Sequence, residues 1–381
     1  MIRFEAVSKR YGRTTYAVRD LDLEVRAGEL CVLVGPSGAG KTTVLKMVNR
    51  LVEPSSGRVL LDGRDVSEVD RVELRRRTGY VIQQAGLFPH LKVADNVASV
   101  PRLLGWDRAA VRERVGDMLE LVGLDPAVYA GRYPHELSGG QAQRVGVARA
   151  LAGDPPVLLM DEPFGAVDPV GRDRLQQEFL RLQGQLRKTV IMVTHDIDEA
   201  VTMGDRIAVL AQGGLLQQYA SPAEVLAHPA TSFVAGFVGA DRGLRRLAVT
   251  PVEPGDLYMP PVVRPSSTVA AAGDAAASGG TDWAVVVGDD GKLLGWVEPR
   301  QILAAGGAAG AKVGLFVRPL EARVSLGSSL RAAFAQMLQQ DAGWVAVLEG
   351  DRYLGVLTPD ALHAALRRSV GGEPLSVPVH K

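Results

Sequence analysis

One glycine-rich segment constrains the fold of this chain more than any other feature. Residues 35–43 read Gly-Pro-Ser-Gly-Ala-Gly-Lys-Thr-Thr and fit the pattern G-x-x-x-x-G-K-[ST], directly after the apolar run 30–34. Glycines in this pattern let backbone N–H groups converge on a phosphate, and a helix that begins near Lys41 adds its positive N-terminal end. A glycine-rich turn with an incidental lysine is the alternative. The predicted phosphate contacts are Gly35, Ser37, Gly38, Gly40, Lys41, Thr42 and Thr43.

An acidic pair later in the chain complements this loop. Asp161 ends the unbroken apolar run 157–161, and Glu162 follows it. Lys41 is expected to reach the β- and γ-phosphates of ATP, while Thr42 and Asp161 would hold Mg²⁺. Glu162 is placed to polarise the attacking water. A solvated acidic pair at a strand end is the alternative, and the apolar run before it and Pro163 after it argue against that interpretation.

Short β-branched runs alternate with longer helical patterns over residues 1–240. Near-continuous hydrophobicity is typical of strands buried on both faces of a mainly parallel sheet. Between residues 90 and 150 the pattern turns helical, with Leu119, Val122 and Leu124 on one apolar stripe. We therefore predict an α/β domain that carries a helical insertion. Its expected strands are 30–34, 79–83, 157–161, 189–194 and 206–210.

The composition argues against several classes of protein. Lys+Arg and Asp+Glu both number 43, so net charge gives no support for binding to nucleic acid, and the arginine run 75–77 is expected to be a solvated helix face. The single cysteine, Cys31, allows no disulfide framework and is expected to be buried. No signal peptide is visible, and the longest uncharged apolar stretch, 301–311, is far shorter than the ~20 residues of a membrane helix. Any role at a membrane would therefore depend on a partner.

After residue 240 the composition changes and the sequence repeats itself. Residues 241–282 are rich in Ala, Gly, Pro and Ser, as a linker is. Trp283 recurs 61 residues later as Trp344, and Gly295 recurs 60 residues later as Gly355. We predict a tandem α+β repeat at about 257–310 and 315–370, with a degenerate first copy. The second copy has an amphipathic helix whose expected apolar face carries Leu330, Phe334, Met337 and Leu338.

A third motif gives the phosphate loop a larger context. The run 138–141, Ser-Gly-Gly-Gln, precedes a predicted helix over 142–150, where a serine N-cap is by itself an ordinary helix start. Together with the phosphate loop, the acidic pair and the run Thr194-His-Asp, however, it resembles the signature of the ABC ATPases over residues 1–240. The resemblance implies a homodimer that sandwiches ATP. In this dimer, one chain would hold the γ-phosphate, and the partner chain would cover it with its copies of Ser138, Gly139, Gly140 and Gln141.

The same resemblance assigns roles to four further positions. Gln83 matches the Q-loop glutamine, which contacts Mg²⁺ and water and faces a transmembrane partner. His195 matches the histidine that contacts the γ-phosphate, and Asp168 matches the D-loop. Tyr11 matches the aromatic residue that stacks on adenine. For His195 a surface histidine, and for Tyr11 a chance aromatic beside glycine, remain the alternatives.

Several short sequence runs narrow the family further. Runs 51–57, 80–90, 132–137, 161–169 and 194–200 resemble the ATPase subunits of importers for glycine betaine, choline, carnitine and proline. The resemblance implies transmembrane permease subunits, an extracytoplasmic substrate-binding protein and a place at the cytoplasmic face of the inner or plasma membrane. The alternatives are an importer ATPase for another amine or amino acid and a soluble, non-transport ABC ATPase. A soluble ABC ATPase usually has coiled coils or two such domains in one chain, and this sequence shows neither.

Such importer subunits often carry paired cystathionine-β-synthase (CBS) modules, which matches the repeat in the tail. In the family these modules gate transport by sensing ionic strength or a nucleotide such as cyclic di-AMP. Adenosyl-binding CBS units read Gly-x-x-[Ser/Thr]-x-x-Asp. The second copy has Thr358 but its Asp360 comes one residue early, and the first has Glu298 and Arg300 instead. These departures argue against an adenine nucleotide, although a cyclic di-nucleotide is kept as a candidate ligand.

Overall fold

The computed structural model describes residues 1–12, 14–83, 86–165 and 167–369. These residues form two compact units, and the division between them falls between Ala240 and Asp241. No helix in the described part of the chain has the length and apolarity needed to cross a bilayer.

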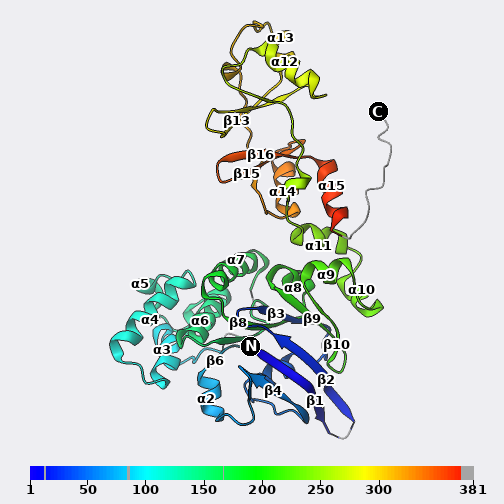
Figure 1. Ribbon diagram of the computed structural model, residues 1–381. Helices are drawn as coiled ribbons and strands as arrows, with labels where there is room; N and C mark the ends of the chain where they lie inside the picture. Colours follow the sequence, from blue (N-terminus) through cyan, green and yellow to red (C-terminus); the bar gives the residue numbers. More distant parts are fainter. Residues whose placement is uncertain (13, 84–85, 166, 370–381) are drawn as a thin grey trace. The chain divides into compact units, whose positions relative to one another are not determined.

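The centre of the first unit is a six-stranded sheet with the order β10-β9-β3-β8-β7-β6 (Figure 1). Five neighbouring strands are parallel, and only β10 runs antiparallel to its neighbour. Every residue of β3, β7 and β8 is buried, which explains their unbroken hydrophobicity. The strands are β3 (Leu30–Val34), β6 (Thr78–Val81), β7 (Val157–Asp161), β8 (Thr189–Thr194), β9 (Arg206–Ala211) and β10 (Leu215–Ala220).

Three of the five expected strands have the expected bounds, and two differ slightly. The strand expected over 79–83 ends at Val81, because its last partner on β7 is Met160. Gln83 therefore lies in the turn that follows the strand. The strand expected over 206–210 continues to Ala211, which pairs with Leu215 of β10.

A second, antiparallel sheet has the order β2-β1-β4-β5. Helix α1 (Lys41–Val48) contacts strands of both sheets, and its residues join one apolar core with theirs. Cys31 is buried in this core, as expected, and burial raises the pKa of its thiol. The strands are β1 (Ile2–Tyr11), β2 (Thr15–Val25), β4 (Ser56–Leu61) and β5 (Arg64–Asp65).

Helices make up the rest of the first unit. The expected helical insertion is present beside β6, and its apolar stripe at Leu119, Val122 and Leu124 is buried. It comprises α3 (Val93–Leu103), α4 (Arg108–Leu121), α5 (Pro126–Tyr129), the 3-10 turn η1 (Pro134–Glu136) and α6 (Gly139–Ala152). The remaining helices are α2 (Arg71–Arg76), α7 (Pro169–Leu186), α8 (Ile197–Met203), α9 (Pro222–Ala227) and α10 (Ser232–Val238).

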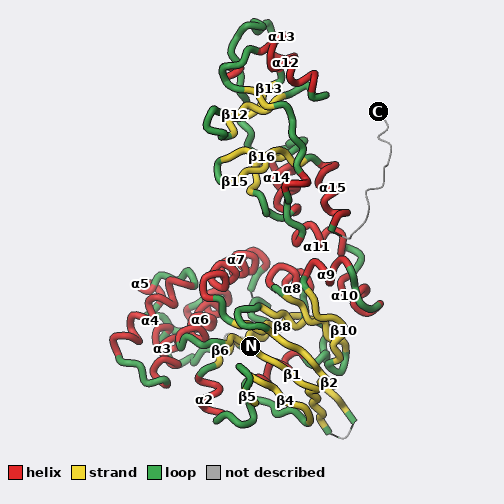
Figure 2. The backbone as a smooth tube through the Cα atoms, in the orientation of Figure 1, coloured by secondary structure: helices red, strands yellow, loops and turns green. Residues whose placement is uncertain are grey.

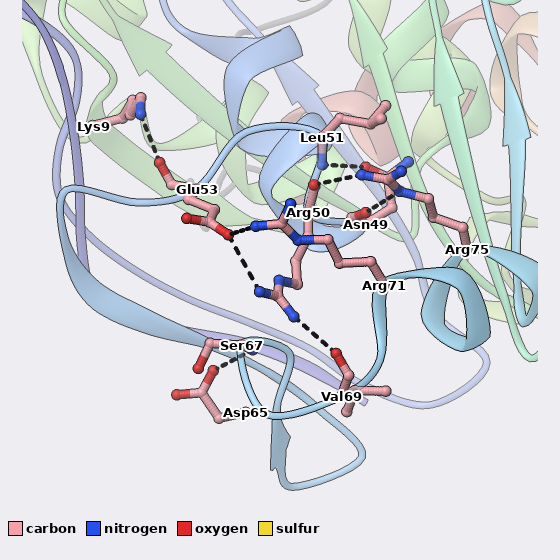
Figure 3. A network of polar contacts seen from close by, with 10 residues as sticks. All are labelled: Lys9, Asn49, Arg50, Leu51, Glu53, Asp65, Ser67, Val69, Arg71 and Arg75. Carbon is pink, nitrogen blue, oxygen red and sulfur yellow. Dashed lines mark hydrogen bonds and ion pairs between the residues drawn. The ribbon is translucent and has the colours of Figure 1, made fainter.

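A polar network ties the end of α1 to α2 (Figure 3). Glu53 accepts hydrogen bonds from Arg50 at 3.2 Å and from Arg71 at 2.5 Å, and these bonds lower the pKa of its carboxyl group. Arg75 donates to the backbone oxygens of Asn49 at 3.2 Å and Arg50 at 2.8 Å. The arginine run is solvent-exposed, as expected, but Arg75 also has a structural contact that the sequence did not predict. Its guanidinium caps the last carbonyls after α1.

The second unit contains two copies of one small fold (Figure 2). Each has a three-stranded sheet, β11-β12-β13 or β14-β15-β16, with a parallel pair followed by an antiparallel pair. The first copy has β11 (Val262–Val263), α12 (Val269–Ser278), β12 (Ala284–Val287), β13 (Leu293–Val297) and α13 (Pro299–Ala304). The second has β14 (Arg323–Ser325), α14 (Leu330–Gln339), β15 (Val345–Glu349), β16 (Arg352–Leu357) and α15 (Pro359–Arg368).

Two expectations for this unit need correction. The start of the segment 241–282 is not a plain linker, because it holds α11 (Arg242–Val249) and the 3-10 turn η2 (Pro254–Asp256), while β11 and α12 fall within the expected first copy. A further 3-10 turn, η3 (Val313–Leu315), follows α13. On α14, Leu330 and Met337 are buried, but Phe334 is 39% and Leu338 66% exposed. The buried stripe runs through Ala333, because the small side chain lets the helix approach its sheet.

Candidate functional site

The glycine-rich loop joins the end of β3 to the start of α1. Gly40 is the N-cap residue of α1, with a left-handed φ of 75°. A Cβ atom at Gly40 would lie 2.0 Å from the carbonyl oxygen of Ala17, which no native packing tolerates. The loop thus requires glycine here for two independent reasons, the left-handed φ and the close approach of Ala17.

Replacing Gly40 by alanine should therefore cost more than replacing its neighbour. Gly38 has a similar φ of 81°, but a Cβ atom there meets nothing within 4 Å. We expect Gly40→Ala to lower the free energy of unfolding by roughly 2–4 kcal/mol, against about 1 kcal/mol for Gly38→Ala. Urea unfolding of both variants measures the difference. Equal losses would show that the Ala17 contact is relieved at no cost.

Lys41, the first residue of α1, is 7% exposed and folds back over the loop. Its Nζ donates to the carbonyl oxygens of Gly35 at 2.7 Å and Pro36 at 2.9 Å. Burial lowers the pKa of Lys41, against the opposing attraction of Glu162 and Asp161. When a nucleotide binds, the ammonium group of Lys41 could replace these hydrogen bonds to backbone carbonyl oxygens with hydrogen bonds to phosphate oxygens.

A hydrogen bond between Thr42 and Asp161 joins the start of α1 to the end of β7. The Thr42 hydroxyl donates to Oδ1 of Asp161 at 2.9 Å, and Asp161 is 9% exposed at the end of β7. Burial raises the pKa of Asp161, while the Thr42 hydrogen bond and two lysines oppose that shift. A buried carboxylate that a divalent cation would further stabilise fits a Mg²⁺ site of a hydroxyl and a carboxylate.

The described residues hold no cluster of three or more His, Cys, Asp or Glu side chains that could bind a metal by themselves. Mg²⁺ characteristically takes one or two protein oxygens together with phosphate oxygens and water. The Thr42 and Asp161 pair fits that mode, with nucleotide and water supplying the other ligands.

Glu162 lies beside this pair and joins two further strand ends. Its Oε2 accepts a hydrogen bond from Nε2 of Gln83 at 2.7 Å, and its Oε1 lies 3.2 Å from Nδ1 of His195. Its backbone has a left-handed φ of 46°, and its N–H donates to the carbonyl oxygen of Val193 at 3.0 Å. Non-glycine residues in this conformation cost of order 1–3 kcal/mol and concentrate at functional sites.

The structure thus gathers Lys41, Thr42, Gln83, Asp161, Glu162 and His195 at one edge of the parallel sheet. They come from the first turn of α1, which follows β3 and the glycine-rich loop, and from the ends of β6, β7 and β8, which are the carboxyl ends where α/β folds bind ligands. The arrangement combines a glycine-rich loop with a buried lysine, a hydroxyl and carboxylate pair, and a second carboxylate held by Gln83 and His195. Such a set can hydrolyse a nucleoside triphosphate.

The other expected site residues lie on separate elements. Ser138 is the N-cap residue of α6, and its hydroxyl accepts from the backbone N–H of Gln141 at 3.3 Å while Oε1 of Gln141 accepts from N–H of Ser138 at 3.0 Å. This capping box starts the helix at Gly139, so the expected start at residue 142 is wrong, and Gly139 and Gly140 form its first turn. Asp168 caps α7 through the N–H of Gly171 at 2.9 Å. Tyr11, at the end of β1, is 49% exposed, with Nζ of Lys9 5.2 Å from its ring centre.

Sequence reasoning missed a buried pair behind His195. Nε2 of Gln176, on α7, donates to Oε1 of Glu199, on α8, at 3.1 Å, and both side chains are buried. Nearby, Nη1 of Arg172 lies 4.0 Å from Oδ2 of Asp196, which caps α8. These contacts join the helix after Asp168 to the helix after His195. The partners are far apart in sequence and follow no motif, so only the fold reveals them.

Glu199 predicts a measurable pH dependence of stability. Burial raises the pKa of its carboxyl group, so the folded state holds the proton more tightly than the unfolded state does. Stability therefore falls as pH rises from the unfolded pKa, about 4.3, through the raised folded pKa. The glutamine of Glu199→Gln cannot ionise, so the variant does not lose this stability. Its melting temperature should therefore increase relative to that of the wild type as the pH rises. Scanning calorimetry from pH 4 to 8 measures this gain, with exposed Glu224→Gln as control. A constant or shrinking difference over that range would contradict it.

Asn96 is a second residue that the sequence did not single out. Its fully buried side chain accepts from the N–H of Phe88 at 2.7 Å and donates to the carbonyl oxygens of Phe88 and Leu91 at 3.2 and 3.1 Å. It thereby fixes the segment 88–92 that leads into α3. The side chain of Phe88 is left 45% exposed on this segment.

The sequence and the fold are both similar to those of known proteins. A family model described as ABC transporter matches residues 18–165. The osmoprotectant import ATP-binding protein OsmV of Salmonella typhimurium is 45% identical over 368 residues, which cover 94% of each chain. The glycine betaine/carnitine/choline transport ATP-binding protein OpuCA of Bacillus subtilis is 43% identical over 375 residues, covering 98% of each. A dimeric ATP-binding cassette, solved in a post-hydrolysis state with ADP and Pi, aligns with a TM-score of 0.53 and 33% identity, over 58% of this chain and 99% of that one.

Proposed function

The chain belongs to the family of ABC transporter ATP-binding proteins, and we propose that it is the ATP-hydrolysing subunit of an importer for quaternary-amine osmoprotectants. The observation that carries the substrate class is similarity over nearly the whole length, tail included, to proteins named for osmoprotectant and glycine betaine, carnitine or choline transport. The observation that carries the reaction is the cluster of Lys41, Thr42, Asp161 and Glu162 at one sheet edge.

In this proposal each residue of the cluster has one task. Lys41 neutralises the β- and γ-phosphates of ATP, and Thr42 with Asp161 holds the Mg²⁺ ion, which supplies charge neutralisation at the transferring phosphate. Glu162 orients and polarises the attacking water. Gln83, which donates a hydrogen bond to Glu162, would contact Mg²⁺ and the attacking water and face the permease. His195, which lies beside the other carboxylate oxygen of Glu162, would contact the γ-phosphate.

The remaining predicted residues would act across a homodimer. Ser138, Gly139, Gly140 and Gln141 begin a helix whose N-terminal end suits an anion, and they form no hydrogen bond with the phosphate loop among the described residues. We propose that they close over the γ-phosphate bound to the partner chain, with Asp168 at the same interface and Tyr11 stacked on adenine. The aligned dimeric cassette with ADP and Pi supports this arrangement.

ATP binding would close the dimer, and hydrolysis with phosphate release would reopen it, which would drive the permease between inward- and outward-facing states. The segment that Asn96 holds, with exposed Phe88, would receive the permease. A substrate-binding protein would deliver the solute from outside, and the ATPase would remain at the cytoplasmic face. The repeat of the second unit would act as a CBS pair that gates this cycle.

A substrate panel tests the proposed function. Cells that lack their own osmolyte importers would express the chain with its permease and binding protein and be given labelled glycine betaine, choline, carnitine, proline and a polyamine. We expect uptake of at least one quaternary amine and none of the polyamine. Uptake of another amine or of an amino acid alone, by a complex that hydrolyses ATP, would leave the ABC assignment intact and overturn the substrate class.

A further inference from the structure

Three of the four tryptophans gather where the two copies of the repeat meet. The rings of Trp283 and Trp344 are stacked, with centres 4.4 Å apart and planes at 10°. Trp296 meets Trp344 edge to face, with centres 6.4 Å apart and planes at 82°. Trp283 and Trp296 belong to the first copy and Trp344 to the second. The cluster therefore spans the junction inside one compact unit.

A cavity of about 380 Å³ opens onto this cluster. That volume lies at the small end of the range for small-molecule sites, ~300–1,000 Å³. Trp296 and Trp344 form its aromatic wall, and the segment Leu320–Ala322 and the turn after α14 form the rest. Both rings are half-buried, so each keeps part of its surface on the cavity.

The charges around the cavity are unbalanced. Glu321 and Asp341 line it, and neither has an ion-pair partner among the residues that the structure describes. Two arginines lie nearby: Arg318 pairs with Glu298 at 2.8 Å and donates to Gln301 at 3.3 Å, and Nε of Arg323 donates to the carbonyl oxygen of Leu320 at 2.6 Å. The guanidinium carbon of Arg318 lies 5.4 Å from the ring centre of Trp296, which shows that this ring already accepts a cation on one face. The side chains that line the cavity itself carry two carboxylates and no cation, and this lining favours a positive ligand over a phosphate.

Exchanging the roles of the two copies gives the equivalent positions on the other side of the junction, and these lack the same side chains. The backbone bridge between Trp296 and Arg318 has its counterpart in the bridge between Val356 and Tyr258. Trp296 thus corresponds to Val356. By the register of the two parallel strand pairs, Glu321 corresponds to Pro260 and Asp341 to Gly280. Trp296 of the first copy and both carboxylates of the second thus occur together on one side of the junction, and the equivalent positions on the other side carry none of them, which argues that they form one site.

From this arrangement we infer that the cavity at Trp296 and Trp344 binds a trimethylammonium cation such as choline. Aromatic faces attract quaternary ammonium groups through the ring quadrupole, and carboxylates add Coulomb attraction. A primary ammonium is strongly hydrated and loses more when it leaves water for an aromatic wall. The carboxylates also disfavour a ligand that carries its own carboxylate, so choline should bind more tightly than glycine betaine.

The site would give the ATPase a sensor on the inner side of the membrane for solutes of the class it imports. The sensor role rests on the proposed function, whereas the inference that the cavity binds a trimethylammonium cation rests only on the residues of the cavity. Occupancy would bridge the two copies through Trp296 and Trp344 and stabilise one arrangement of the repeat. A ligand that binds one arrangement more tightly shifts the population toward it.

Tryptophan fluorescence of the full-length chain tests the inference. Trp106 lies in the first unit, so Trp106→Phe leaves only the three tryptophans of the cluster. At constant ionic strength we expect a saturable change with choline and tetramethylammonium, and a weaker one with glycine betaine. Neither 3,3-dimethylbutanol, the uncharged analogue of choline, nor ethanolamine, its primary amine, should match choline.

Matched variants locate the binding. Glu321→Gln and Asp341→Asn should each weaken choline binding by roughly five- to tenfold. Glu349→Gln, which removes an exposed carboxylate outside the cavity, should leave it unchanged. No saturable response to choline, equal responses in all three variants, or saturation by a cyclic di-nucleotide with none by choline would overturn the inference. Because no permease is present, these outcomes are independent of whether quaternary amines are transported.

Discussion

Glu162→Gln should reduce steady-state ATP hydrolysis by about a hundred- to ten-thousandfold while leaving ATP binding intact. The carboxylate accepts a hydrogen bond from Gln83 at 2.7 Å and lies 3.2 Å from Nδ1 of His195. A glutamine side chain has nearly the same shape and can still accept from Gln83. It cannot, however, carry the negative charge that polarises a water molecule.

The same variant should accumulate as an ATP-bound dimer. If hydrolysis reopens the dimer, then blocking it leaves the closed state as the end point of ATP binding. Phosphate release and light scattering with and without ATP measure the two effects. Glu113→Gln removes an exposed carboxylate on α4 and serves as the matched control. Hydrolysis by Glu162→Gln at the wild-type rate would remove Glu162 from the proposed role.

Lys41→Met should weaken ATP binding by about a hundredfold or more. Hydrogen bonds from a charged donor are worth roughly 1.5–3 kcal/mol each, and Lys41 is expected to make such bonds to two phosphates. The side chain is 7% exposed and already positioned by the carbonyl oxygens of Gly35 and Pro36, so little ordering remains when nucleotide arrives. Methionine keeps the length and the apolar stem but offers no donor.

Competition with a fluorescent ATP analogue measures this loss. Lys188→Met is the matched control, because its cation pairs with Asp154 at 2.7 Å, in a contact separate from the phosphate loop. We expect the control to bind ATP as wild type does, and both variants to keep cooperative unfolding. Unchanged ATP affinity in Lys41→Met would mean that the phosphates lie elsewhere.

The sequence predicted best where one physical cause dominates. The strands β3, β7 and β8 are buried on both faces, so their hydrophobicity is continuous and their bounds could be predicted to the residue. The start of α6 could not, because glycine is a poor helix former and the capping box of Ser138 and Gln141 overrides that propensity.

Prediction failed where the answer depends on tertiary packing. Apolar residues cover a wide arc of α14, and only its contact with the sheet selects Leu330 and Met337 over Phe334 and Leu338. The bond between Gln176 and Glu199, and the tryptophan-lined cavity between the repeats, likewise join residues that no local pattern connects. Motifs located the phosphate chemistry, whereas the fold was needed to find what supports it.

The central claim is that ATP hydrolysis by this chain drives the import of a quaternary amine. The most direct test is accumulation of labelled glycine betaine in proteoliposomes that contain the whole complex, with ATP on the side of this subunit and binding protein on the other. We predict ATP-dependent accumulation by wild type and none by the Glu162→Gln complex. Accumulation without ATP, or equal accumulation by both complexes, would contradict the account.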